Sequence, residues 1–99
     1  MKKGAGVDIV YIPKVEKILR NKQVLSRMFH KSELSPFTAE HLAGIIAAKE
    51  AYMKAIGKKI NWLSIEVKKK SNKPYFANKK SLLSISHEKD YAIAFVVIL

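Results

Sequence analysis

The sequence predicts an α+β fold built around one long helix. The stretch from Thr38 or Ala39 to Ile56 has apolar residues at helical spacing and is the longest periodic segment in the chain. Short segments rich in Val and Ile lie on either side of it and are separated by turn residues, which is typical of strands. No internal repeat and no Pro/Gly/Ser-rich linker is visible, so we expect a single domain over residues 1–99.

A strand and two short helical pieces are predicted before the long helix. The segment Ala5–Val10 predicts a buried strand that ends near Asp8. Pro13 is placed at the start of an amphipathic helix whose outer face is basic. A second helical piece is predicted over Gln23–Phe29, and a turn or single helical turn over His30–Pro36.

The long helix has clear boundary signals, and strands are predicted after it. Thr38 can cap its first turn and Gly57 can end it. Turn chemistry such as Ser71–Lys73 separates the later segments. The predicted strands are Leu63–Val67, Pro74–Ala77, Leu82–Ser86 and Tyr91–Ile98.

Composition limits the classes of function. Nineteen Lys and Arg against eight Asp and Glu give a net charge of +11, which attracts nucleic acid, acidic proteins or phosphorylated small molecules. The absence of cysteine excludes disulfides, zinc-thiolate sites, iron–sulfur clusters and thiol nucleophiles, and favours the cytoplasm. The apolar runs at Met1–Val10 and Tyr91–Leu99 are too short for a signal peptide or a membrane span, so we expect a soluble protein.

The small size of the chain favours assembly. A chain of 99 residues hides only about 60–65% of its unfolded surface when it folds. A cleft that encloses a nucleotide would consume much of this small core, whereas a site between subunits would not. We therefore expect a homo-oligomer.

Four charged residues each have two interpretations. Glu50 and Lys54 share a helix face and fit either a surface ion pair or a phosphate site, with a hard cation on Glu50 and a phosphoryl oxygen on Lys54. Lys49 falls on the face of the long helix where the apolar residues repeat, so its charge must either extend to solvent or meet an anion. Asp8 interrupts a strand and is either a strand-end residue that accepts backbone hydrogen bonds or a functional carboxylate.

Several motifs occur in order along nearly the whole chain. They are Gly6–Ile9, Leu42–Gly44 followed by Ala47–Ala51 and Lys54–Ala55, and Ser84–Glu88, with Arg27–Glu33 and Lys73–Tyr75 in support. Together they resemble the holo-acyl-carrier-protein synthases, a family of 4'-phosphopantetheinyl transferases. The resemblance implies a fold in which a long central helix packs on an antiparallel sheet. It also implies a homotrimer that binds coenzyme A between neighbouring subunits.

The resemblance further implies an enzyme that transfers 4'-phosphopantetheine from coenzyme A to a serine of acyl carrier protein in fatty acid biosynthesis. Asp8 and Glu50 match the family's magnesium ligands, and Lys54 matches a lysine beside the phosphates, so these three are the expected catalytic residues. Mg²⁺ prefers oxygen ligands and retains waters, so two carboxylates suffice for a site. The general base stays open between a metal-bound water and a carboxylate such as Glu33. The expected coenzyme-binding residues are Lys49, His87, Lys73 and Pro74.

A basic surface is expected to bind the acidic carrier protein. Complementary charge speeds association and loses its effect as salt rises. The residues proposed for this surface are Lys14, Lys17, Arg20 and Arg27, with Lys22 between them.

Two neighbouring positions depart from the family pattern. Ile45 stands where the family usually has arginine, and Ile46 stands where an aromatic residue is more usual. We predict a weaker hold on the 3'-phosphate of coenzyme A. Lys49, Lys58 or Lys59 are candidates to replace the lost charge, although lysine lacks the planar fork of arginine.

Two other functions fit parts of the sequence. Lysine runs such as Lys68–Lys70 near aromatic residues fit a small nucleic-acid-binding protein, but the lysines are spread along the chain and no nucleic-acid-binding signature accompanies them. A family member that binds carrier protein without catalysis is the second alternative. The presence of Asp8, Glu50 and Lys54 argues against it.

Overall fold

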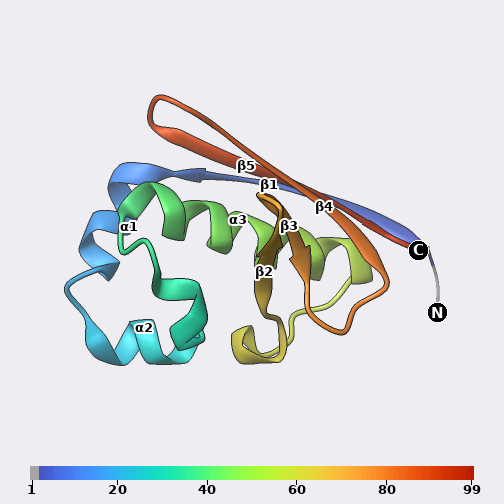
Figure 1. Cartoon of the computed structure of the whole chain (residues 1–99), viewed down its shortest axis with the longest axis horizontal. Helices are drawn as coiled ribbons and strands as arrows, with labels where there is room; N and C mark the ends of the chain where they lie inside the picture. The colour runs from blue at the N-terminus through green and yellow to red at the C-terminus, as the bar shows by residue number, and fades with distance from the viewer. Residues whose placement is uncertain (1–2) are drawn as a thin grey trace.

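The structure is a computed structural model that describes residues 3–99, and it confirms the α+β prediction (Figure 1). A long helix, α3, lies against a three-stranded antiparallel sheet of order β1-β5-β4, and a separate hairpin pairs β2 with β3. In chain order the elements are β1 (Gly4–Tyr11), α1 (Ile12–Ile18), α2 (Lys22–Met28), η1 (Lys31–Leu34), α3 (Ala39–Ile56), η2 (Trp62–Ser64), β2 (Val67–Lys70), β3 (Lys73–Phe76), β4 (Ser81–Glu88) and β5 (Tyr91–Ile98).

The α3 helix begins and ends where its sequence predicts. The Thr38 hydroxyl oxygen accepts a hydrogen bond from the His41 backbone N–H at 3.1 Å, which satisfies one free donor of the first turn. Gly57 has a φ of 77° and donates its N–H to the Met53 carbonyl at 2.9 Å, which closes the last turn. Every residue from 42 to 49 is buried, because other elements surround this part of the helix. No helix within residues 3–99 combines the length and apolarity needed to cross a bilayer.

Strand β1 packs directly on the backbone of α3. A Cβ atom on Gly4 would lie 2.2 Å from the Ala55 carbonyl oxygen, and one on Gly6 would lie 2.0 Å from that of Ala51. No side chain fits at such distances, so glycine is required at both positions. This close approach brings the residues that follow Gly6 against the flank of the helix.

The strand predicted over Ala5–Val10 is confirmed as β1, but the predictions that it is buried and ends near Asp8 are wrong. The strand continues to Tyr11, and Gly6 is its single buried residue. The sheet face that points away from α3 carries apolar side chains that are 41–61% exposed. This outer sheet face consists of Val7, Ile9, Tyr11, Leu82, Tyr91, Ile93 and Phe95.

The predicted strand Leu63–Val67 is wrong except at Val67. Leu63 and Ser64 belong to the 3₁₀ turn η2, because the Asn61 side chain accepts a hydrogen bond from the Leu63 N–H at 2.9 Å and caps the turn. Strand β2 begins only at Val67. The three later strand predictions are confirmed as β3, β4 and β5. The ends of β3 and β4 are shifted by one or two residues, and β5 has the predicted bounds.

Candidate functional site

Asp8, Glu50 and Lys54 form a group at the β1 edge of the sheet, which we call the carboxylate cluster. The Asp8 Oδ1 atom accepts a hydrogen bond from the Lys54 amino group at 3.0 Å, and the same amino group donates to the Val7 carbonyl at 3.1 Å. Glu50 lies one turn before Lys54 on the same flank of α3 and is half-buried. Lys54 therefore pairs with Asp8, and the surface ion pair considered between Glu50 and Lys54 is not the one that forms.

The carboxylate cluster has a donor set that suits a hard divalent cation. Mg²⁺ is usually held by one or two carboxylates and takes its other oxygen ligands from water and substrate phosphates. No group of three or more acidic or histidine side chains within residues 3–99 would hold a metal on protein ligands alone. Two carboxylates beside Lys54 thus fit a cation whose coordination is completed by water and the substrate.

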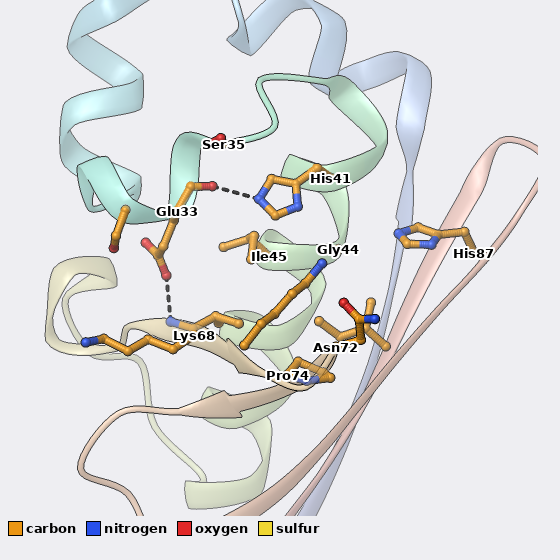
Figure 2. Close-up of a pocket in the computed structure, with 13 residues that line it drawn as sticks. Glu33, Ser35, His41, Gly44, Ile45, Lys68, Asn72, Pro74 and His87 are labelled. Carbon is orange, nitrogen blue, oxygen red and sulfur yellow. Dashed lines mark hydrogen bonds between the residues drawn. The ribbon is translucent and has the colours of Figure 1, made fainter.

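A cavity of about 460 Å³ lies at the opposite edge of the sheet, between η1, α3, β2 and β4 (Figure 2). We call it the β4 pocket. His87 reaches it from β4, and its Nε2 atom lies 3.3 Å from the point where a Cβ on Gly44 would stand. Gly44 therefore gives this imidazole room beside the helix. The lining residues are Ser32, Glu33, Ser35, His41, Gly44, Ile45, Val67, Lys68, Lys69, Asn72, Pro74, Ile85 and His87.

The carboxylate cluster and the β4 pocket lie on opposite flanks of α3 within one chain. In the sheet register, Asp8 of β1 stands opposite Ala94 of β5, which stands opposite Ile85 of β4. Two strand spacings separate the sheet edges by about 10 Å. Helix α3 covers the face between these edges, with Gly44 near β4 and Ala51 against β1. The helix thus stands between the two sites.

Lys49 has a structural environment that differs from its predicted coenzyme-binding role. Its amino group is fully buried and donates to Glu33 Oε1 at 2.8 Å, the Met28 carbonyl at 2.7 Å and the Trp62 carbonyl at 3.1 Å. Burial lowers the pKa of Lys49, and the bond to Glu33 opposes that shift. These three bonds use every N–H of the ammonium, so Lys49 has no donor left for a phosphate.

Both carboxylate oxygens of Glu33 also accept internal hydrogen bonds. Its Oε1 atom accepts from the His30 N–H at 2.8 Å as well as from Lys49, and its Oε2 atom accepts from the Val67 N–H at 2.7 Å. The residue is 2% exposed. A general base must reach the proton that it removes, and Glu33 cannot. The structure therefore argues against Glu33 as the base.

The remaining predicted residues lie at the surface or in the β4 pocket. Pro74 and His87 line the pocket together, whereas Lys73 lines a neighbouring groove between β3 and β4 that Pro74 shares. Lys58 and Lys59 do not line the pocket. The residues predicted to contact the carrier protein are exposed on or beside α1 and α2: Lys14, Lys17, Arg20 and Arg27.

Sequence reasoning missed three residues that line the β4 pocket, His41, Lys68 and Lys69. One signal was available for the first, because His41 precedes Ile45 by four residues and therefore shares its helix face. Lys68 and Lys69 carried no such signal. Their place at the pocket comes from the packing of the β2–β3 hairpin beside α3 and β4.

Comparisons with known proteins agree with this architecture. The model of the 4'-phosphopantetheinyl transferase superfamily matches residues 4–96. A holo-[acyl-carrier-protein] synthase of Thermodesulfovibrio yellowstonii is 41% identical over 115 residues, covering 99% of each chain. A crystal structure of a Bacillus anthracis holo-(acyl-carrier-protein) synthase in complex with CoA (3',5'-ADP) is 34% identical with a TM-score of 0.83, covering 95% of this chain and 93% of that one. The Helicobacter pylori synthase in complex with coenzyme A is 32% identical with a TM-score of 0.80, covering 95% of this chain and 97% of that one. By fold and by sequence, the chain belongs to the 4'-phosphopantetheinyl transferase superfamily.

Proposed function

We propose that this protein transfers the 4'-phosphopantetheine group from coenzyme A to a serine of acyl carrier protein, in fatty acid biosynthesis, and that it requires Mg²⁺. The observation that carries the proposal is the carboxylate cluster, in which Asp8 meets Lys54 at 3.0 Å beside Glu50. Relatives that match nearly the whole chain are holo-acyl-carrier-protein synthases, and three matching structures contain coenzyme A or a part of it. A cytoplasmic location belongs to the same proposal and is supported by the absence of cysteine.

The chemistry follows from the charges that the reaction moves. The serine hydroxyl gives up its proton, which ends in solvent, and its oxygen forms a bond to the phosphorus on the pantetheine side of the diphosphate. The bond from that phosphorus to the bridging oxygen breaks. Negative charge then gathers on adenosine 3',5'-bisphosphate as it leaves. The Lys54 side chain is 55% exposed, so its ammonium can reach a phosphoryl oxygen and stabilise this charge. Asp8 and Glu50 would hold Mg²⁺, which when bound neutralises diphosphate oxygens.

We infer that coenzyme A binds between two copies of the chain. A ligand that contacts both the carboxylate cluster and the β4 pocket would have to cross α3 within one chain, but it need not do so between copies. The pocket volume of about 460 Å³ also holds only part of a molecule as large as coenzyme A. The outer sheet face offers an apolar surface for assembly, since large exposed apolar patches mark interaction sites. A homotrimer follows from the family resemblance.

The carrier protein would dock on the exposed basic residues of α1 and α2. Lys14 and Lys17 point to solvent from α1, and Arg27 does so from α2. Charge complementarity at such a surface raises the association rate and weakens with salt. The net charge of +11 would then serve to attract the acidic carrier protein.

Mass spectrometry of the carrier protein tests the activity directly. Apo carrier protein is incubated with the enzyme, coenzyme A and Mg²⁺, and the expected result is a mass increase of one phosphopantetheine group. Asp8→Ala and Glu50→Ala should abolish this increase, and so should chelation of the metal. Asp90→Ala, at an exposed carboxylate in the turn between β4 and β5, is the matched control that should keep it. An unmodified carrier protein under all conditions would overturn the proposal.

Mixed oligomers test the shared site. Asp8→Ala and His87→Ala chains, each inactive or nearly so alone, are co-expressed with different tags and purified together. If each site takes Asp8 from one copy and His87 from its neighbour, each purified mixed trimer has one intact site, which is about a third of its sites. Recovery of activity is expected. Purified mixed oligomers without recovery would place both residues in a site within one chain.

A further inference from the structure

Three side chains that can carry positive charge surround one end of the β4 pocket. His41 comes from α3, Lys69 from β2 and His87 from β4, and all three line the cavity. In Figure 2, His41 and His87 lie near Gly44, on the side of the drawn residues away from Lys68. The carboxylate among the lining residues belongs to Glu33, whose charge is paired with Lys49. This end of the pocket therefore favours an anion.

The imidazole of His41 is oriented by a backbone contact. Its Nε2 atom lies 2.8 Å from the Glu33 carbonyl oxygen. A carbonyl can only accept, so Nε2 must carry a hydrogen whether the ring is neutral or charged. The titrating proton therefore belongs to Nδ1, which points away from Glu33 (Figure 2). The His41 backbone N–H donates to the Thr38 side chain, and no residue from 3 to 99 forms a hydrogen bond with Nδ1, which can therefore meet a ligand.

We propose that His41 is a further coenzyme-binding residue, which together with Lys69 and His87 holds the 3'-phosphate of coenzyme A and takes up a proton on Nδ1 when that phosphate binds. The inference rests on the proposed function, because it assigns the ligand of the same site. Lys49, Lys58 and Lys59 do not supply the charge that is absent at Ile45. His41 lies one helical turn from Ile45 and supplies this positive charge when its imidazole is protonated, so the supply depends on pH.

The groups around His41 explain why binding and protonation are linked. Burial lowers the pKa of His41 in the free protein, and the charges of Lys69 and His87 lower it further, while the contact with Glu33 opposes these effects. Glu40 is exposed and lies 4.0 Å from His87 Nδ1, where it faces the second imidazole. A phosphate dianion placed between these cations favours the charged form of His41. Affinity for coenzyme A should therefore rise as pH falls from about 8.5 to about 6.5, above the range near pH 6 in which a phosphate monoester gains its own proton.

Calorimetry with two ligands tests the inference. Coenzyme A and dephospho-coenzyme A, which lacks the 3'-phosphate, are titrated into the intact assembly in buffers of different ionisation enthalpy, which gives the number of protons taken up. The wild type should take up protons with coenzyme A but not with dephospho-coenzyme A. His41→Gln keeps an amide donor for Glu33 and should lose this uptake. It should also weaken coenzyme A binding about tenfold at pH 6.5, as expected for one charge-assisted hydrogen bond, while dephospho-coenzyme A binding changes less than about twofold.

A pair of lysine variants covers the case in which His41→Gln fails to fold. Lys69→Gln and Lys70→Gln each remove one exposed charge from β2, but of these two residues only Lys69 lines the β4 pocket. Lys69→Gln should weaken coenzyme A binding more than dephospho-coenzyme A binding, whereas Lys70→Gln should not discriminate between them. Equal proton uptake in wild type and His41→Gln, or equal behaviour of the two lysine variants, would overturn the inference while transfer activity persists. A wild type that binds no coenzyme A would overturn the proposed function as well.

Discussion

Replacing Lys49 with methionine tests how much the buried ion pair stabilises the protein. The Lys49 ammonium bonds to Glu33 and to the carbonyls of Met28 and Trp62, so it ties α3 to the end of α2, to η1 and to η2. Methionine keeps an unbranched side chain but removes the charge and all three donors. The Glu33 carboxylate would stay buried with two backbone N–H partners.

The expected loss of stability is large for a protein of this size. Removal of one partner of a buried ion pair costs about 3–5 kcal/mol, because an unpaired charge stays behind. The two backbone donors that Glu33 retains favour the lower end, about 3 kcal/mol, which corresponds to a fall in Tm of about 12–24 °C for a domain of up to 100 residues. Glu33→Gln in the Lys49→Met background removes the stranded charge. The double variant should therefore lose about 1–3 kcal/mol less than the sum of the single variants.

Urea unfolding followed by circular dichroism measures these changes. All variants must be compared at one protein concentration, because assembly adds concentration-dependent stability. Lys70→Met removes an exposed ammonium and is the matched control, with an expected change within about 0.5 kcal/mol. A Lys49→Met protein as stable as this control, or single-variant losses that simply add, would refute the assigned role of the ion pair.

Three further predictions address the packing, the titration and the carboxylate cluster. Gly6→Ala would place a Cβ 2.0 Å from the Ala51 carbonyl oxygen and should lower stability by at least about 1–3 kcal/mol in thermal unfolding, and an unchanged Tm would contradict the packing of β1 on α3. Burial lowers the pKa of His41 from 6.5, so the unfolded chain binds more protons below that pH, and stability should fall on acidification from about pH 7 to 5.5. The His41→Gln protein should lose this part of the slope in urea unfolding, and an unaltered slope would count against it. Asp8→Ala should abolish transfer yet cost less than about 1 kcal/mol of stability, because its partner Lys54 is 55% exposed, and a globally unfolded variant would assign Asp8 a structural role instead.

Local patterns were sufficient for much of the fold. The boundaries of α3 depend on the Thr38 cap and the left-handed Gly57, and both act on neighbours within four residues along the chain. Strands β3, β4 and β5 were predicted from the same kind of local signal. The η2 segment was predicted wrongly, because its apolar residues resemble a strand while the Asn61 side chain caps a turn.

The candidate site depends on contacts that no local pattern contains. Asp8 and Lys54 lie 46 residues apart in sequence and meet because Gly6 lets β1 approach the helix backbone. Lys49 and Glu33 lie 16 residues apart, and their buried contact changed an expected phosphate ligand into a structural ion pair. A charge can be read from the sequence, but its partner is set by packing.

By itself, the sequence determined the α+β class, the extent of α3 and, through ordered motifs, the residues Asp8, Glu50 and Lys54 as the expected catalytic group. Only the tertiary structure decided that the carboxylate cluster and the β4 pocket lie on opposite flanks of α3, that the outer sheet face is exposed, and that His41 and Lys69 line the pocket. The physical reason is the range of the interactions. Periodicity and capping act within a few residues of the chain, whereas burial, ion pairing and the separation of two sites depend on which distant segments pack together.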